Sequence, residues 1–165
     1  MARFTLLILI FGLCRTGIGQ DFTGQVFIVA EEFLEEECRV VAECDCCATE
    51  LFFLPGTKFG FVSRCLSGDT YFTGTYSLAS SRLVLKFMSV YVDEIVDDDY
   101  KVIKYETRQQ NMDAIEFEIK QCGQRIRLTH PTTRDWKNAS RYPESAEKMK
   151  LHKLLTSKPW KQLSR

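Results

Sequence analysis

The sequence predicts a mainly β fold: an antiparallel up-and-down barrel or strongly bent sheet of about seven strands, with a C-terminal helix. Apolar and polar residues alternate with the period of a strand in successive segments before residue 130. Short turns join these segments, as in consecutive hairpins. Residues 144–156 instead follow helical spacing, with Pro143 at the start. A barrel or bent sheet is favoured because it limits the number of open strand edges.

The first 19 residues have the composition of a signal peptide. Arg3 supplies a positive charge, residues 4–13 form an apolar run, and Gly17 and Gly19 are the small residues that a signal peptidase requires. The run is too short to span a bilayer as a helix, and no later segment is apolar enough to hold the chain in a membrane. We therefore expect a secreted or periplasmic protein, with no membrane span, that begins at Gln20.

The mature chain divides into a disulfide-stapled β domain, residues 20–130, and a basic loop and helix tail, residues 131–165. The β domain has 11 Lys or Arg against 19 Asp or Glu, whereas the tail has 9 against 3. We expect the tail to lie against the body or to be solvated beside it, so that the β domain folds without it; binding of an anionic partner is the alternative. No nucleic-acid partner is expected, because the tail lacks interleaved aromatic and basic residues and the body repels phosphate.

The first element of the β domain is a strand. Residues 25–29, with the sequence QVFIV, have strand composition. The apolar residues that follow fall at helical spacing, with glutamates between them. We therefore expect a first strand and then a short helix, whose apolar positions are Ala30, Phe33, Leu34, Cys38 and Val41.

Residues 49–65 predict a hairpin with two candidate turns. A two-residue turn at Pro55 and Gly56 would splay the strands, so a four-residue loop over residues 55–58 is preferred. The four-residue loop places Ala48 opposite Cys65 with Cys47 beside it, and the two-residue turn places Cys46 opposite Cys65. In both registers Phe52 and Phe61 point to the same side.

Two further hairpins and one strand complete the predicted sheet. Residues 71–87 alternate strictly and turn at Ser80 and Ser81, residues 100–107 form a strand, and residues 115–128 turn around Gly123. The apolar cross-strand pairs of the first of these hairpins are Leu78 with Leu83, Tyr76 with Leu85, and Gly74 with Phe87. The apolar face of the other consists of Ile115, Phe117, Ile119, Ile126 and Leu128.

The tail is predicted to begin as a loop. Pro131 ends the β region in this interpretation, and residues 131–143 have loop composition. The helix over residues 144–156 then packs on the body or on a partner. Its packing residues are expected to be Met149, Leu151, Leu154 and Leu155.

The cysteines are the strongest indication of how the fold is held together. Because Cys14 lies in the signal peptide, the mature chain has an even number of cysteines in an exported location, which indicates structural disulfides. The candidates are Cys38, Cys44, Cys46, Cys47, Cys65 and Cys122. Neighbouring strands hold side chains at about the separation that a disulfide needs, so we expect Cys65 to pair with Cys46 or Cys47. The other pairings stay open.

A metal or redox role for these cysteines is less favoured. The run CDCC lacks the two-residue gap of a zinc knuckle, and no second knuckle follows. The C-x-x-C motif of a thioredoxin-like device is missing as well. Copper(I) binding by thiolates is the alternative if the cysteines stay reduced. The sequence therefore predicts no metal site and no cofactor.

The remaining polar motifs are weak indicators of chemistry. His130 and His152 stand in no zinc-binding or nucleophile-activating motif, so both are expected to be structural. The acidic run over residues 93–99 lacks the spacing and the glycine of an EF-hand, and a solvated loop is expected in place of a calcium site. Asn138 begins a sequon for N-glycosylation.

One stretch also resembles a known class of proteins. The run CLSGDTYFTGTYSLASSRLVLKF, with its G-T-Y step and a second strand of alternating Leu and Phe, is similar to small secreted lipocalin-like, calycin-type domains of bacterial envelopes. The similarity covers roughly residues 51–87, and two features depart from true lipocalins: the missing G-x-W motif and the added CDCC run. The resemblance implies a barrel that holds a ligand between aromatic side chains, which here are Phe52, Phe53, Phe59, Phe61 and Tyr76.

Two functions follow as hypotheses. The first is an extracytoplasmic binding module that accepts a small apolar ligand in the barrel. The alternative is a structural or interaction domain of the cell envelope, whose barrel is filled by its own side chains and whose partner is another envelope protein. An enzyme is not expected, because the alternation places most acidic residues on solvated faces and no nucleophile stands beside a base.

The disulfide interpretation makes a direct prediction. We expect the exported protein to contain no more than one free thiol, because six cysteines in an oxidising compartment with cross-strand proximity pair with one another. Thiol titration under denaturing, non-reducing conditions measures this number. Four or more free thiols would contradict the prediction and favour metal binding.

Overall fold

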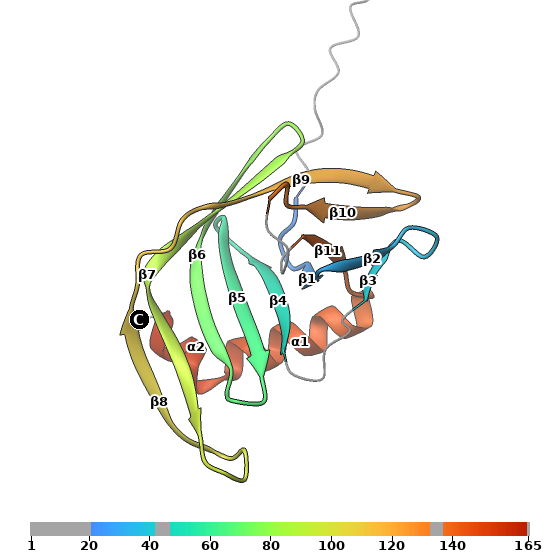
Figure 1. The fold of residues 1–165 in the computed structure, drawn as a ribbon. Helices are drawn as coiled ribbons and strands as arrows, with labels where there is room; N and C mark the ends of the chain where they lie inside the picture. Colours follow the sequence, from blue (N-terminus) through green and yellow to red (C-terminus); the bar gives the residue numbers. More distant parts are fainter. Residues whose placement is uncertain (1–20, 42–46, 133–136, 165) are drawn as a thin grey trace, which may run out of the picture.

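The computed structural model describes residues 21–41, 47–132 and 137–164 (Figure 1). The predicted signal peptide, Cys14, Cys44 and Cys46 lie outside these residues. Among the described residues, no helix is both long and apolar enough to cross a membrane.

The described strands form a closed antiparallel barrel, which confirms the predicted fold class. Hydrogen-bonded neighbours follow one another around the ring, and pairing of β6 with β7 closes it. In ring order the strands are β1 (Val26–Ala30), β4 (Cys47–Leu54), β5 (Lys58–Cys65), β6 (Thr70–Ala79), β7 (Arg82–Val96), β9 (Ile115–Cys122), β10 (Arg125–Thr129) and β11 (Asn138–Arg141).

Two insertions extend from the ring. A hairpin of β2 (Glu32–Leu34) and β3 (Arg39–Val41) follows β1, and β8 (Val102–Gln109) pairs with the second half of β7 beyond the point where β9 leaves it. Figure 1 shows the β7–β8 ribbon projecting from one end of the barrel and the β2–β3 hairpin beside the β9–β10 hairpin.

The prediction of a helix after β1 is wrong. Residues 32–41 form the β2–β3 hairpin, and Val40 is buried with its backbone N–H donating to the Ser140 hydroxyl. Cys38, in the turn, has a left-handed backbone (φ 49°) that a helix would not allow. The helical spacing of the apolar residues was therefore outweighed by tertiary hydrogen bonding and by the disulfide-bonded Cys38.

The loop prediction for residues 131–143 is also wrong in its second half. β11 lies between β1 and β10, with Ala139 opposite both Val29 and Leu128. Ala139 is completely buried in the barrel interior. A four-residue strand with the sequence NASR shows no alternation of its own, so its pairing depends on the two strands beside it. The segment treated as a tail thus supplies a barrel strand.

The predicted inner faces of the later hairpins are confirmed. β6 and β7 pair Leu78 with Leu83, Tyr76 with Leu85 and Gly74 with Phe87, around the turn at Ser80 and Ser81. The predicted strand at residues 100–107 corresponds to β8. The apolar faces of β9 and β10 join the same interior cluster, in which Leu83, Leu85, Phe117 and Leu128 are completely buried.

The β4–β5 register lies between the two that the sequence suggested. Leu54 pairs with Lys58 across a three-residue turn, in which Gly56 and Thr57 both have left-handed backbones (φ 71° and 56°). A one-residue change of register moves side chains to the opposite face of a sheet. Phe52 therefore pairs with Gly60 and Phe61 with Leu51. The prediction that Phe52 and Phe61 share a side is wrong.

Two helices cover the outer wall of the barrel beside β4 and β5 (Figure 1). These are α1 (Glu144–Thr156), which begins after Pro143 as predicted, and α2 (Lys158–Leu163). Leu154 and Trp160 pack with Phe52 and Val62 in an outer apolar cluster. Gly60 makes room for this contact, because a Cβ there would lie 3.0 Å from the Trp160 ring.

Only part of the predicted packing face of α1 is buried. Leu154 is 1% exposed and Leu151 is partly buried against the outer cluster, whereas Met149 is 67% and Leu155 47% exposed. Glu147, in the first half of the helix, is only 2% exposed. It accepts a hydrogen bond from the Val26 backbone N–H and forms an ion pair with Arg141. The helix is therefore fastened by polar contacts at its beginning and by apolar contacts near its end.

These contacts reverse the expectation for a shortened chain. We expect a chain that ends at His130 to lose cooperative unfolding, because β1 and β10 would lack the strand between them. A chain that ends at Tyr142 keeps β11, and we expect it to retain the barrel with lower stability. Urea denaturation followed by far-ultraviolet circular dichroism, which reports on the backbone, measures both variants. Cooperative unfolding of the chain ending at His130, at the midpoint of the longer variant, would contradict this expectation.

Candidate functional site

Aromatic side chains form a ladder at the end of the barrel where β6 begins. This aromatic ladder consists of Phe61, Phe72, Phe87 and Tyr91. The Phe87 ring centroid lies 5.5 Å from that of Phe61 and 6.0 Å from that of Phe72, and Tyr91 stacks on Phe72 at 5.1 Å. Phe61 is buried at the base, whereas Phe72, Phe87 and Tyr91 keep part of their surface in solvent. The ladder thus offers aromatic surface that continues directly into the core.

The interior near the β4–β5 turn is filled instead. Phe22, from the segment before β1, stacks on Phe53 at 4.8 Å and lies edge-on to Phe27 at 5.7 Å. Tyr76 lies edge-on to Phe53 at 5.0 Å. The three phenylalanines are completely buried and Tyr76 is 8% exposed. A ligand there would have to displace protein side chains.

The residues predicted to line a ligand site are thus distributed over three environments. Phe53 and Tyr76 lie in the filled region, and Phe59 is completely buried between it and the aromatic ladder, 5.0 Å from Phe87. Phe61 belongs to the ladder itself. Phe52 lies outside the barrel beneath the helices. Whether any of them contacts a ligand stays a prediction.

Sequence reasoning missed the partly exposed members of the ladder. The strict alternation of β6 and β7 places Phe72 and Phe87 on the inner face, so the signal was present. Alternation also places Tyr91 on the face of Phe87, but its pairing with Phe72 could not be predicted, because the β6–β7 register shifts between Phe72 and Gly74. A bulge of this kind re-aims side chains without leaving a clear mark in the sequence.

His130 is partly buried and lies next to Phe117 of the barrel interior. The two ring centroids are 5.8 Å apart, edge to face. Burial lowers the pKa of His130, which favours the neutral imidazole at neutral pH. Its Nδ1 accepts a hydrogen bond from the Thr132 backbone N–H at 3.1 Å, so the proton of the neutral ring resides on Nε2. The histidine therefore adds a polar, uncharged group to an aromatic surrounding.

A buried ionic network lies on the outer wall, under α1. The Glu50 carboxylate, 3% exposed, accepts a bond from Arg64 Nε at 2.6 Å and pairs with Lys150 of α1. Burial opposes the charge of Glu50, but the bonds from Lys150 and Arg64 outweigh it and lower the Glu50 pKa. The same pairing raises the pKa of Arg64 against the effect of burial. Glu50 is thus a charged anchor for the helix.

The network continues to the carboxylates of Asp69 and Glu94, which both contact the Tyr71 hydroxyl. Arg64 Nη1 lies 2.6 Å from Asp69 Oδ2, and the Tyr71 hydroxyl lies 3.3 Å from Asp69 Oδ2 and 3.1 Å from Glu94 Oε1. Burial and the nearby Asp69 charge raise the pKa of Glu94. Burial and both carboxylates raise the pKa of Tyr71, so its hydroxyl stays protonated. The cluster joins β4, β5, β6 and β7, which is a structural role.

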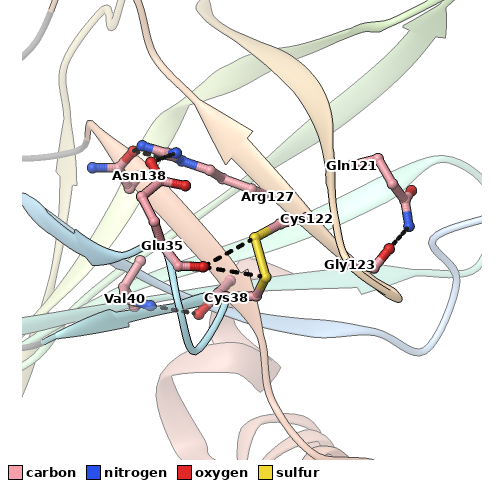
Figure 2. The surroundings of a disulfide bond; sticks show 9 residues. Glu35, Cys38, Val40, Gln121, Cys122, Gly123, Arg127 and Asn138 are labelled. Atoms are coloured by element: carbon pink, nitrogen blue, oxygen red, sulfur yellow. Dashed lines mark hydrogen bonds and ion pairs between the residues drawn. A yellow bond between two sulfur atoms is a disulfide. The ribbon is translucent and has the colours of Figure 1, made fainter.

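A disulfide joins the tips of two hairpins. Cys38, in the β2–β3 turn, is bonded to Cys122 at the end of β9, with Cα atoms 5.7 Å apart (Figure 2). The Glu35 carbonyl oxygen lies 3.6 Å and 3.7 Å from the two sulfurs. Because disulfide sulfur has no proton to donate, these are sulfur–oxygen contacts. The second described disulfide, Cys47–Cys65, confirms the expected partner of Cys65.

Arg127 reinforces the same attachment. Its guanidinium donates to Asn138 Oδ1 at 2.8 Å and 3.1 Å and pairs with Glu35 (Figure 2). It also lies 3.9 Å from the centroid of the Phe33 ring. Asn138 in turn donates to the Glu31 carbonyl at 2.6 Å and is 3% exposed. The sequon asparagine therefore has its side-chain amide buried and hydrogen-bonded, and a glycan there is incompatible with this packing.

The other polar groups of the described residues form no metal-binding cluster. Among the described residues, no group of three or more His, Cys, Asp or Glu side chains could hold a metal ion. Asp93 and Glu94, predicted to lie in an acidic loop, are strand residues of β7. Asp97 Oδ1 accepts hydrogen bonds from the backbone N–H groups of Asp99 and Lys101, and these bonds close the β7–β8 turn.

A surface hollow lies between the β9–β10 turn and the start of α1. Its volume is about 240 Å³, and its lining includes Arg125, Arg141 and Glu144. Arg141 is held by Glu147 through two bonds of 2.8 Å, so its charge is already compensated. The residues predicted to bind an apolar ligand do not line this hollow.

The ionic network predicts opposite effects for its two glutamates. At pH 7 we expect Glu50→Gln to lower the free energy of unfolding by about 3 kcal/mol, because the partly buried Lys150 and Arg64 lose their shared buried carboxylate. Among the described residues, Arg64 then keeps only Asp69 as an ion-pair partner. Glu94→Gln should leave stability equal or higher, since its raised pKa means that ionised Glu94 opposes folding. Urea denaturation of both variants measures this difference.

The pH dependence supplies the control. A lowered pKa stabilises the fold above the ordinary range of glutamate, and this contribution disappears as the pH falls through the folded value. The deficit of Glu50→Gln should therefore stay constant from pH 7 down to the ordinary glutamate pKa of roughly 4.3, and shrink between that value and about pH 3. A deficit that also stays constant over this lower range would show that the charge of Glu50 is not the cause.

Comparison with known proteins yields a similarity of fold. No protein-family model matches the chain, and no curated protein matches it. The crystal structure of a streptavidin-like protein from Bacteroides eggerthii DSM 20697 is similar over 85% of this chain and 92% of that one, with a TM-score of 0.59 and 10% sequence identity. At this identity the similarity concerns the fold alone. The chain has a streptavidin-like, calycin-type barrel fold, in agreement with the resemblance seen in its sequence.

Proposed function

We propose that this protein is an extracytoplasmic binding module that holds a small apolar ligand at the aromatic ladder. The observation that carries the proposal is the contrast between the two ends of the barrel interior. Phe22, Phe27 and Phe53 are completely buried, whereas Phe72, Phe87 and Tyr91 are only partly buried. Aromatic surface left partly in solvent at a barrel end is suited to an apolar ligand.

The fold supports this location. Small closed barrels can hold one small ligand, and ligand sites in barrels occur preferentially at the mouth. Phe61 lies beneath Phe72 and Phe87, so a ligand stacked on the ladder would rest on a rigid aromatic floor. Rigid side chains lose little conformational entropy when they bind, which favours affinity.

The disulfides support the proposed compartment. Cys38–Cys122 and Cys47–Cys65 form disulfide bonds, and such bonds persist in oxidising environments outside the cytoplasm. The signal peptide predicted from residues 1–19 agrees with export. Both observations are consistent with a protein that meets its ligand in the periplasm or outside the cell.

The proposal is tested by Tyr91→Ala and the apolar fluorescent probe N-phenyl-1-naphthylamine. Tyr91 is stacked on Phe72 and partly exposed, so its loss should weaken probe binding roughly threefold to tenfold, as expected for one aromatic contact. Tyr100→Asn is the matched control, because Tyr100 is 65% exposed in the β7–β8 turn and has a left-handed backbone that asparagine accepts. Its affinity should not change.

Two outcomes would overturn the proposal. One is failure of the wild-type protein to bind the probe and to retain any small molecule in native mass spectrometry. The other is an equal loss of affinity in both variants, which would place the probe outside the ladder. In either case a filled barrel that serves as a structural or interaction domain of the envelope becomes the better description.

A further inference from the structure

We propose that the outer edge of β8 binds a second copy of this chain, so that two β8 strands pair antiparallel about a two-fold axis at Tyr105. The proposal concerns a surface outside the barrel and does not depend on the ligand proposed above. It rests on three features of β8: an edge without a neighbouring strand in the described part of the chain, the direction of its backbone groups, and the order of its charges.

The first feature is the position of β8 in the sheet. Each strand of the ring has neighbours on both sides, whereas β8 is the last strand in the order and pairs with β7 alone among the described residues. β8 is eight residues long and contains no proline. Val102 is 43% and Ile103 61% exposed. A long edge strand of this kind is a template for pairing with another strand.

The second feature is the direction of the backbone groups. Val90 lies opposite Gln109, and in the next pair the Gln110 N–H donates to the Ser89 carbonyl, so Ser89 and Gln110 are a bonded pair. Bonded and non-bonded pairs alternate along an antiparallel ladder, so Arg108, Glu106 and Lys104 bond to β7. The N–H and C=O groups of the intervening residues therefore point away from β7. These residues are Ile103, Tyr105 and Thr107.

The third feature selects one register. With the axis at Tyr105, the three outward-pointing residues face Thr107, Tyr105 and Ile103 of the second copy and form bonded pairs. Lys104 of each copy then lies opposite Glu106 of the other. An axis at Glu106 would oppose two glutamates and bring Lys104 opposite Arg108, and an axis at Lys104 would oppose two lysines. Like charges directly opposite destabilise a sheet, which disfavours both of these axes. An axis at Thr107 would place Glu106 opposite Arg108, but it pairs only residues 105–109 of β8, whereas the Tyr105 axis pairs residues 102–108 and is therefore favoured.

The charged side chains that would pair across the axis already lie on one face of β8. Within one chain Lys104 Nζ lies 2.5 Å and Arg108 Nη2 2.8 Å from the Glu106 carboxylate, so the three side chains lie in a row on one face. On the opposite face Tyr105 lies under Lys158 of α2, whose Nζ is 5.0 Å from the ring centroid. Lysine on an edge strand usually discourages pairing. Here the opposing glutamate compensates it.

The inference is tested by sedimentation equilibrium of the full-length mature protein. We expect the wild type to be a dimer in reversible equilibrium with the monomer, and Thr107→Pro to be monomeric, because proline removes an outward N–H without removing a bond to β7. Thr107→Ala keeps that N–H and should dimerise as the wild type does. Equal denaturation midpoints for the two variants, measured at a dilution at which both are monomeric, show that the fold is retained.

Charge reversal provides a second test that requires no proline. Lys104→Glu places two like-charged pairs across the axis and should weaken dimerisation roughly tenfold. Lys104→Glu combined with Glu106→Lys restores opposite charges and should recover most of the affinity. A wild type that is monomeric at its highest soluble concentration would overturn the inference. So would a dimer that both Thr107→Pro and Lys104→Glu leave unchanged.

Discussion

The insertion of β11 between β1 and β10 is the pairing on which the rest of the structure depends. Without it, β1 and β10 would each expose an edge, and the aromatic interior would open to solvent along the gap. The same short strand carries Asn138 and Ser140, which bind the β2–β3 hairpin, and Arg141, which binds α1. Four residues therefore connect the barrel, the disulfide-linked hairpin and the helix.

The two faces of the sheet have different physical roles. The inner face is almost wholly apolar, and its phenylalanines fill the barrel near the β4–β5 turn while leaving part of their surface exposed at the other end. The outer face combines an apolar cluster around Trp160 with the charged network around Glu50. Both sets of contacts hold the helices on the outer wall, whereas the aromatic ladder lies on the inner face.

How much of this was predictable depends on the range of the interactions. The β6–β7 and β9–β10 hairpins were predicted correctly, since strict alternation and a short turn fix a local register. The β4–β5 hairpin was misplaced by one residue, because its three-residue turn has two left-handed positions, one of them Thr57, which a sequence pattern does not reveal. That single residue moved Phe52 from the candidate site to the outer wall.

The sequence by itself determined the fold class, the inner faces of the long hairpins and the pairing of Cys65 with either Cys46 or Cys47, because these follow from side-chain alternation between neighbouring strands. Only the tertiary structure decided that residues 138–141 are a barrel strand, that residues 32–41 are a hairpin, and that Phe72, Phe87 and Tyr91 form the exposed aromatic surface. Those elements are short or irregular, and their conformations are stabilised by contacts with residues distant in the chain, such as Arg127 with Glu35 and Cys38 with Cys122. Local periodicity carries no information about such contacts, which is why the sequence could not supply them.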